Sequence, residues 1–509
     1  MIAEPLGTIV CTEDGPSTEQ ISFVVGNRNT STTTVGQIPV HVGQYVSVET
    51  EEGLVMAHVE QVYKTNRYFS QVDAVHEFTR SGKPFGAIFP IDRWEYILAK
   101  ATPLGIFEQD RIQRITYPPS PGAIVSSPDP SILSRFLGFS KDGIHLGHLL
   151  FHRIPATFDL TKMFQKHVAL LAMSGAGKSY AASVMIEELL ARKTAQGRPA
   201  ILIIDVHGEY GGLAEAQEIK GTKVAEQLSV IRSPLVEIAT PYMNAKSFAA
   251  YSPDMGTIQV RELSRIIRTL RSVRKGQPYD LGDLITALEK DPSINTRTRE
   301  ALLGWLDNLQ SYNLFGKTST PEWQKLMKPG HGVILDMSET VSLQKKQIIV
   351  DAVLRHLFNL RRDGAIPPTV VFLEESHQFC PEARRALAFS KGIVETIARE
   401  GRKYNLSLCI ISQRPVRLST TVLSQCGTNI FLRISNPYDL DHIRATSEKI
   451  TKATLTSISS LSVGEALVVG QATRFPVFIQ VRKRTTKETA FHEDFETVAK
   501  KFEKKGKAK

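Results

Sequence analysis

Cysteine is scarce in this sequence, and long apolar runs are missing. The four cysteines are scattered and form no C-x-x-C pair, which predicts small buried residues in a reducing compartment rather than disulfides or a metal site. No run of about 18 apolar residues occurs, so we expect no membrane-spanning helix. Met1–Pro5 has neither the basic start nor the apolar core of a signal peptide. These absences favour a cytoplasmic protein.

Acidic residues are fewer than basic ones. The chain has 52 Asp and Glu against 62 Lys and Arg, which leaves a formal net charge of +10. This balance favours a polyanionic partner such as nucleic acid, although surface lysines also keep proteins in solution. A length of 509 residues predicts about two to four domains.

The sequence pattern changes once along the chain. Residues 1–150 hold short β-rich runs separated by turn residues, which predicts a small β-barrel or sandwich domain. Residues 151–484 alternate apolar runs with helical stretches, typical of a parallel sheet covered on both faces. Strand signals fade at about 211–330, where we expect a helical insertion. Residues 485–509 form a basic C-terminal tail rich in lysine.

A glycine-rich segment in the second domain is the strongest motif. It lies between an apolar run at 168–171 and a helix-like run at 180–191, the setting of a phosphate-binding loop. Its backbone N–H groups and the following helix N-terminus converge on an anion. We expect Lys178 to reach the β- and γ-phosphates of ATP and the Ser179 hydroxyl to ligate Mg²⁺. Ala172 replaces the usual first glycine. The expected nucleotide-binding residues are Ser174, Gly175, Ala176, Gly177, Lys178, Ser179 and Tyr180.

Two carboxylates end another β run and supply what hydrolysis needs. Thr369–Leu373 is followed directly by Glu374 and Glu375, the form of a Walker B strand. We expect Glu374 to stand near the Mg²⁺ shell, through water. Glu375 is the candidate for polarising the attacking water.

Two further strand ends carry polar residues. Asp205 closes the run 200–204 and is followed by His207 and Glu209, which form a catalytic pair, line the site, or belong to a hydrogen-bonded loop. Gln413 follows the run 406–411, and its amide is a candidate contact to the γ-phosphate or the water. Arg414 is next to it, and a polar loop is the alternative for both.

The ordered set of motifs resembles the HerA family of DNA-translocating ATPases, within the FtsK/HerA superfamily. The matching segments are 146–147 with Pro155, 166–167, 174–179, 205–210, 373–377, 399–403, 412–415 and 464–466. The resemblance implies a RecA-like P-loop ATPase core with a helical insertion, preceded by a HAS-barrel-like domain. It also implies a homohexameric ring on double-stranded DNA, a NurA-type nuclease partner and a role in DNA end resection.

The resemblance further implies that each nucleotide site lies between subunits and takes a cation from the neighbour. The family places a trans-acting arginine just before the phosphate-loop strand, where this sequence has Lys166, with Arg153 upstream. Arg399 and Arg402, three residues apart and therefore on one helical face, are the other candidates for the catalytic cation. Their alternative role is a solvated or subunit-contact face.

Basic residues at helical spacing within the expected insertion are candidates for contacts to DNA phosphates. They are Arg261, Arg265, Arg268 and Lys275, with Arg271 and Arg274 nearby, and a solvated basic face is the alternative. Because no base-reading motif occurs, the expected binding is sequence-independent. Two other functions stay open: an ATP-regulated ring scaffold for an effector nuclease, and a conjugation or secretion motor. The intact carboxylate pair favours sustained ATP turnover.

Overall fold

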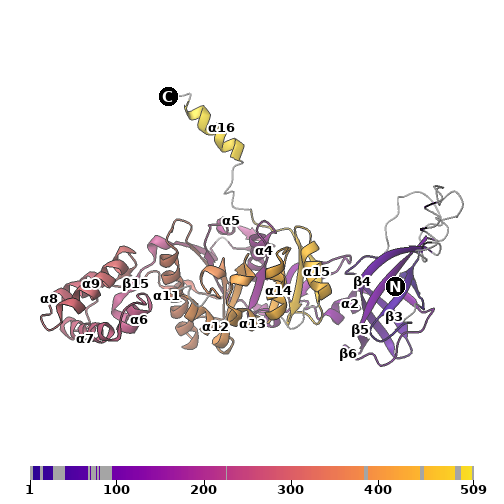
Figure 1. The fold of residues 1–509 in the computed structure, drawn as a ribbon, viewed down its shortest axis with the longest axis horizontal. Coiled ribbons are helices and arrows are strands. Elements are labelled where there is room, and N and C mark those ends of the chain that lie inside the picture. Colours follow the sequence, from indigo (N-terminus) through magenta and orange to yellow (C-terminus); the bar gives the residue numbers. More distant parts are fainter. Residues whose placement is uncertain are drawn as a thin grey trace. The chain divides into compact units, whose positions relative to one another are not determined.

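The computed structural model describes residues 4–11, 15–26, 40–66, 69, 76, 80, 95–224, 226–382, 388–446, 452–487 and 495–506. The chain divides into two compact units (Figure 1). The first comprises Met1–Gly143, Gly147–Phe158 and Thr473–Gln480. The second comprises Ile144–Leu146, Asp159–Ala472 and Val481–Lys509.

The first unit contains a closed β-barrel. Its strands run in the order β2-β1-β7-β3-β4-β5, and β2 pairs with β5 to close the ring, while β6 extends β5 as a hairpin. Closure matters because it leaves no unpaired edge among these six strands. The bounds are β1 Pro5–Ile9, β2 Ile21–Val25, β3 Tyr45–Thr50, β4 Gly53–Asn66, β5 Glu95–Glu108, β6 Arg111–Gln113 and β7 Ile124–Ser126.

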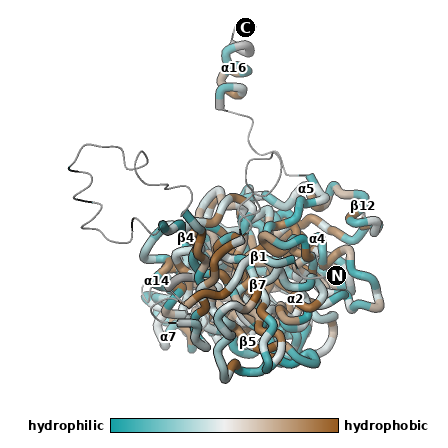
Figure 2. The backbone as a smooth tube through the Cα atoms, turned by 90° about the vertical axis from the view of Figure 1, so that its right-hand side faces the viewer, coloured by the Kyte–Doolittle hydropathy of each residue, from teal (hydrophilic) through white to brown (hydrophobic). Residues whose placement is uncertain are grey.

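Apolar side chains fill the barrel, and its strands carry hydrophobic stretches that are brown in Figure 2. Phe23, Val48 and Ala99 are fully buried in this cluster. The two longest strands bend around it, because the pairing of β4 with β5 shifts register after Met56 and again after Val59. The sequence-predicted barrel is therefore confirmed. The rest of this part of the chain contains α2 Pro130–Leu137, β8 Ile144–Leu149, β9 Pro155–Phe158 and β22 Val477–Val481.

The second unit is built on a mainly parallel sheet. Its strands run β14-β17-β11-β18-β19-β10-β20-β21, all parallel to their neighbours except β21. The central strands are buried along their whole length, which explains their continuous apolar runs. The bounds are β10 Val168–Leu171, β11 Ala200–Asp205, β14 Leu228–Arg232, β17 Gly332–Asp336, β18 Thr369–Leu373, β19 Leu406–Ser412, β20 Thr428–Phe431 and β21 Glu465–Gly470.

Helices flank this sheet, and most follow a strand directly. They are α3 Leu160–Phe164, α4 Lys178–Leu190, α5 Gly211–Ala214, α11 Leu343–Arg362, α12 Lys391–Tyr404, α13 Thr420–Gln425, α14 Pro437–Thr446 and α15 Lys452–Ser460. The basic tail contains one further helix, α16 Phe495–Gly506. Within the described residues, no helix is both long and apolar enough to cross a membrane.

The insertion is helical from Ala245 onward, and its helices pack together at one end of the second unit (Figure 1). Leucines and isoleucines three or four residues apart form its core, as on α7, where Leu263, Ile266, Ile267 and Leu270 are buried. The helices are α6 Ala245–Ala250, α7 Thr257–Arg274, α8 Leu281–Lys290, α9 Thr296–Ser311 and α10 Trp323–Leu326.

Strands also occur inside the range expected to be helical. The edge strand β14 joins the main sheet there, and its side chains are only partly buried, so its sequence lacks the apolar run of a central strand. Two short pairs accompany it, β12 Glu218–Ile219 with β13 Thr222–Lys223 and β15 Ile238–Ala239 with β16 Phe315–Gly316.

Candidate nucleotide site

The phosphate-binding loop forms between β10 and α4, as the sequence predicts. Gly175 and Gly177 have φ angles of 74° and 92°, left-handed values that favour glycine. Gly177 caps α4, which begins at Lys178, so the unpaired N–H groups of its first turn face the loop. Ala172 is fully buried and is not among the residues with positive φ, so alanine fits in place of glycine.

Parallel pairing brings Gln413, Glu374 and Glu375 to the same edge of the sheet as the phosphate loop. Leu171, the last residue of β10, pairs with Ser412, the last residue of β19, and the N–H of Ala172 donates to the Ser412 carbonyl over 3.3 Å. Gln413 is therefore adjacent to the start of the phosphate loop. β19 lies between β10 and β18 in the sheet. Glu374 and Glu375, which directly follow β18, are therefore two strands away from β10 at the same edge.

Glu375 and Lys178 form a buried ion pair. Lys178 Nζ lies 3.1 Å from Glu375 Oε1, and the two side chains are 11% and 3% exposed. Glu375 has a left-handed φ of 45°, uncommon for a residue with a side chain and typical of strained functional positions. The predicted phosphate ligand and the predicted water-activating carboxylate are thus in direct contact.

Sequence reasoning did not assign a role to His377, which approaches the same carboxylate. Its Nδ1 lies 3.2 Å from Glu375 Oε2 and 3.3 Å from the Ser412 hydroxyl. His377 is in the short 3-10 helix Ser376–Gln378, directly after the carboxylate pair. Burial lowers the pKa of His377, against the raising effect of Glu375. It is well placed to hold Glu375 in position beside Gln413.

Glu374 is held by the neighbouring strand. Its Oε2 accepts a hydrogen bond of 2.8 Å from the N–H of Val206, and among the described residues its buried Oε1 has no hydrogen-bond partner. Burial raises the pKa of Glu374, and the charge of Asp205 adds to this effect. A cation or a water bound to it is the kind of partner that an unsatisfied buried oxygen needs.

A divalent cation fits this site as a partner of nucleotide, not as a separate metal centre. Within the described part of the chain, no group of three or more His, Cys, Asp or Glu side chains is arranged to hold a metal. The donors available are the Ser179 hydroxyl and Glu374 Oε1, and Mg²⁺ in such sites takes its other ligands from phosphates and water.

Asp205 organises a loop. One of its oxygens accepts from the N–H groups of Gly208 and Glu209 at 2.7 and 3.0 Å, and the other from Tyr210 at 3.0 Å. Of the alternatives left open by the sequence, the hydrogen-bonded loop is the one that this geometry supports. The loop in turn presents the Val206 N–H to Glu374.

Lys346 is a buried residue of this site that no sequence motif indicated. It lies on α11, is 9% exposed, and its Nζ donates to the Val206 carbonyl over 3.1 Å. Burial lowers the pKa of Lys346, whereas the charges of Glu374 and Asp205 raise it. The side chain therefore supplies positive charge behind the Walker B carboxylate.

Replacing Lys346 by methionine is expected to weaken both stability and turnover. The variant keeps the apolar stem but removes one buried cation near Glu374 and Asp205 and the hydrogen bond to the Val206 carbonyl, at a cost of about 1–3 kcal/mol. Thermal unfolding and steady-state ATP hydrolysis measure the two effects, with Lys345→Met on the same helix as the control. Wild-type values in both assays contradict this role.

Three of the four candidate cations line one cavity. Lys166, Arg399 and Arg402 surround a space of about 580 Å³, together with Asn429 and Gln471. Lys166 precedes β10, so this cavity is at the amino-terminal edge of the strand, whereas the phosphate loop follows its carboxyl end. Four residues of β-strand span about 13 Å, so these cations are remote from the phosphates of their own chain. Arg153 belongs to the first unit and is exposed.

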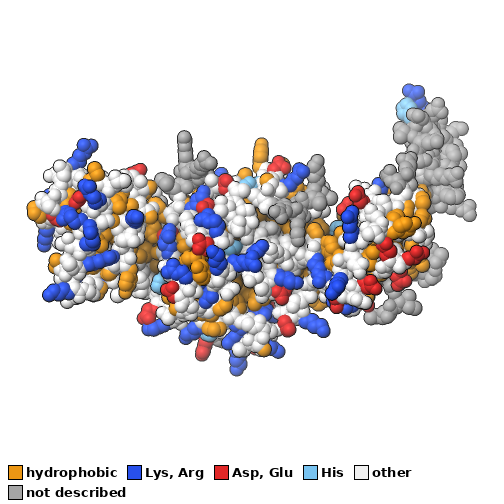
Figure 3. Space-filling model, turned by 90° about the horizontal axis from the view of Figure 1, so that it is seen from below, with side chains coloured by type: hydrophobic (Ala, Val, Ile, Leu, Met, Phe, Trp, Pro, Cys, Tyr) orange, Lys and Arg blue, Asp and Glu red, His pale blue; other side chains and the backbone are white. Residues whose placement is uncertain are grey.

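The basic residues of α7 are largely engaged within the insertion. Arg265 pairs with Asp291 at 2.8 Å and Arg274 with Asp283 at 2.5 Å, while Arg271 donates to the carbonyls of Pro241 and Met243. Arg261 and Arg268 are more exposed. Basic side chains (blue) still gather over the insertion on the face in Figure 3.

A phosphate loop, a buried lysine–glutamate pair and a parallel sheet define the chain as a P-loop ATPase with a RecA-like core. Residues 144–357 match the family described as the central domain of helicase HerA. A probable helicase of Methanocaldococcus jannaschii is 24% identical and shares 91% of each chain. The DNA double-strand break repair helicase HerA of Pyrococcus furiosus is 24% identical over 87% of this chain and 88% of its own.

Among solved structures, VirB4 of Thermoanaerobacter pseudethanolicus has the same fold. Its TM-score is 0.52 at 19% identity, with 68% of this chain and 98% of VirB4 covered. The chain is thus similar to the HerA family over residues 144–357 and to HerA helicases over most of its length. The P-loop ATPase fold expected from the motifs is confirmed.

Proposed function

We propose that this protein is an ATP-driven ring translocase and helicase on double-stranded DNA. In this proposal it acts with a NurA-type nuclease in DNA end resection during double-strand break repair. The names of the HerA relatives support a role in such repair, and the net charge of +10 suits a polyanionic track. The barrel at about residues 1–150 takes the place of the HAS domain.

The cavity lined by Lys166, Arg399 and Arg402 is the observation that supports a ring of subunits. Hydrolysis develops charge at the γ-phosphate that a second cation beside Lys178 must neutralise. Lys166, Arg399 and Arg402 are positioned at the opposite edge of the sheet from their own loop, and in this proposal they act on the nucleotide of a neighbouring chain. A head-to-tail arrangement of copies supplies this contact and closes into a ring, here a homohexamer.

The proposed chemistry uses residues of one chain and a cation of the next. The loop N–H groups and Lys178 hold the phosphates, and Ser179 and Glu374 hold Mg²⁺, which supplies charge neutralisation at the phosphates. When phosphate takes the place of Glu375 as the partner of Lys178, that carboxylate becomes free to accept a proton from water. Gln413 orients the water, and His377 keeps Glu375 in register.

The proposal predicts that duplex DNA stimulates hydrolysis at least about tenfold, because engagement of the track closes the sites between subunits. Steady-state ATPase with and without blunt duplex of mixed sequence measures this. A parallel assay follows displacement of a protein roadblock from the same duplex. Unstimulated hydrolysis without roadblock displacement contradicts a translocase and favours an ATP-regulated scaffold for the nuclease.

A further inference from the structure

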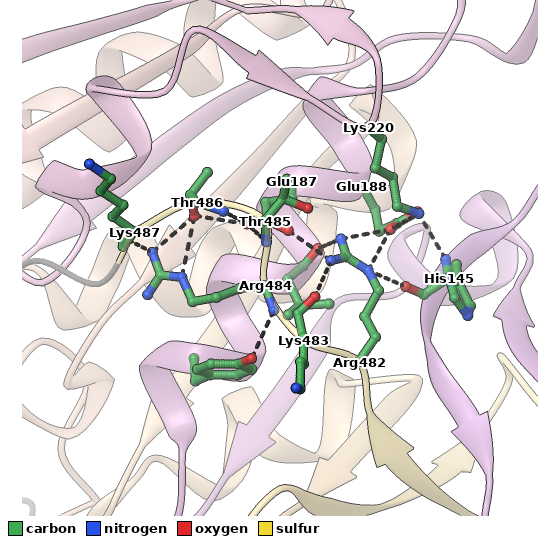
Figure 4. A network of polar contacts seen from close by, with 12 residues as sticks. His145, Glu187, Glu188, Lys220, Arg482, Lys483, Arg484, Thr485, Thr486 and Lys487 are labelled. Atoms are coloured by element: carbon green, nitrogen blue, oxygen red, sulfur yellow. Dashed lines mark hydrogen bonds and ion pairs between the residues drawn. The ribbon is translucent and has the colours of Figure 1, made fainter.

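A C-terminal segment is fastened to the phosphate-loop helix. Residues 482–487, called here the C-terminal strap, lie against Glu187 of α4 (Figure 4). Glu187 Oε1 accepts 2.8 Å hydrogen bonds from the N–H groups of Thr485 and Thr486 and from the Thr486 hydroxyl. Its Oε2 accepts from Arg482 Nη1, also over 2.8 Å. Glu187 is fully buried, so these bonds are shielded from water.

A second carboxylate reinforces the attachment. Arg482 Nη2 lies 2.8 Å from Glu188 Oε1, and Lys220 pairs with the same carboxylate. Burial opposes ionisation of Glu187, but its hydrogen bonds to Thr486, Thr485 and Arg482 hold its pKa below the usual value. Both anchors are charged and doubly bonded, so the strap has a fixed position relative to α4.

This fixed position places Arg484 over Tyr180. The backbone N–H of Arg484 donates to the Tyr180 hydroxyl over 2.8 Å, and the guanidinium carbon lies 5.9 Å from the centre of the tyrosine ring. Arg484 Nη2 also donates to the Thr486 hydroxyl and the Lys487 carbonyl. Among the described residues, no hydrogen bond engages Nη1. The pair therefore offers an aromatic ring and a planar cation with a free donor edge.

The strand order places this pair on the nucleoside side of the site. Glu375 and Gln413 follow β18 and β19, on one side of β10, and so mark the γ-phosphate end. The strap follows β22, and the strand order continues from β10 through β20 and β21 to β22 on the other side. Tyr180 is the first residue after the lysine and serine of the loop and lies in the first turn of α4.

We propose that Tyr180 and Arg484 form the base-binding part of the nucleotide site and that it takes a purine. A purine has the larger aromatic face for stacking on a guanidinium or a phenol ring, and its ring nitrogens accept from an Arg donor. The proposal rests on the proposed nucleotide site and adds to it the C-terminal strap, which sequence motifs leave unassigned. Arg482, Glu187 and Thr486 are positioning residues for this pair.

Affinity for ligands with and without a base tests the proposal. Calorimetry on the full-length protein compares a non-hydrolysable ATP analogue, its cytidine counterpart and tripolyphosphate, each with Mg²⁺. Arg484→Ala is expected to raise the Kd for the ATP analogue about tenfold and to leave that for tripolyphosphate unchanged. In the same variant, the ratio of the Kd for the cytidine analogue to the Kd for the ATP analogue is expected to fall. Lys483→Ala is the matched control, because this exposed neighbour contributes only its backbone carbonyl to the network, as acceptor from Arg482 Nη1.

Two conservative variants keep the test interpretable. Tyr180→Phe keeps the ring and should retain most affinity, and Arg484→Lys keeps the charge but loses the plane and should bind as weakly as the alanine variant. Wild-type affinity in Arg484→Lys, or an equal loss for tripolyphosphate, overturns the proposal. Binding is measured without hydrolysis, so this test does not depend on the test of the translocase. If the protein discriminates between bases but duplex DNA does not stimulate its ATP hydrolysis, only the translocase proposal is refuted.

Discussion

Changing Glu375 to glutamine is expected to remove nearly all ATP turnover and to leave ATP binding intact. The amide keeps the size of the side chain at a position that is 2% exposed, so the packing around it is preserved. It cannot accept a proton from water. General-base catalysis contributes about 10²–10⁴-fold to a rate, which corresponds to about 3–5 kcal/mol of barrier.

The ion pair with Lys178 adds a second expectation for this variant. In the structure Glu375 Oε1 lies 3.1 Å from Lys178 Nζ, so the carboxylate pairs with the lysine that must bind phosphate. Glutamine carries no charge, so ATP no longer has to displace a carboxylate from Lys178. We therefore expect the variant to bind ATP about two- to tenfold more tightly. Steady-state hydrolysis and titration with a fluorescent ATP analogue measure the two effects separately.

The control for this experiment is Glu400→Gln, which removes an exposed carboxylate from α12. It should hydrolyse ATP at the wild-type rate. Retention of wild-type hydrolysis by Glu375→Gln would falsify the assignment of this residue as the water-activating group.

The second large effect concerns the cation that crosses between subunits. Lys166→Ala is expected to lower hydrolysis about 10²-fold or more, because loss of a charge at the transferring phosphate costs several kcal/mol. Arg399→Ala and Arg402→Ala test the other two cavity residues in the same way. Lys162→Ala is the control for Lys166, and Lys403→Ala, exposed on the same helix, is the control for Arg402.

Mixing two inactive variants distinguishes action in trans from action in cis. Where a Lys166→Ala subunit supplies Glu375 and a Glu375→Gln neighbour supplies Lys166, the shared site is complete. Random equimolar mixing restores about a quarter of the sites, since each site draws one element from each of two chains. Mixed rings that form and bind ATP but show no recovery exclude Lys166 as the trans-acting cation. The same mixing with Arg399 or Arg402 variants then identifies the group.

Contiguous motifs made much of the site predictable. The phosphate loop, the strand before it and the helix after it are adjacent in sequence, so residues 168–190 specify their own geometry. Likewise, Glu374 and Glu375 follow a buried strand directly, and parallel strands place their carboxyl ends at one edge. The position of Gln413 beside Ala172 follows from the same rule.

Side chains that depend on distant partners were not predictable. Lys346 on α11 reaches Val206 in the loop after β11, and the backbone N–H of Arg484 reaches the Tyr180 hydroxyl over 304 positions of sequence. The helical spacing of the α7 arginines indicated a basic face, yet Asp283 and Asp291 on and after α8 neutralise two of them. The domain boundaries and the roles of the individual site residues stay predictions.

The sequence by itself determined that this chain binds a nucleoside triphosphate, because the spacing of the glycines, lysine and serine sets the conformation of the phosphate loop. It also determined the parallel sheet, because strands buried on both faces need continuous apolar runs. Tertiary structure alone decided that the barrel closes through β2 and β5, that Lys166, Arg399 and Arg402 share a cavity, and that the C-terminal strap is bound to α4. Each of these arrangements joins residues far apart in the chain, whose encounter depends on how the whole core packs.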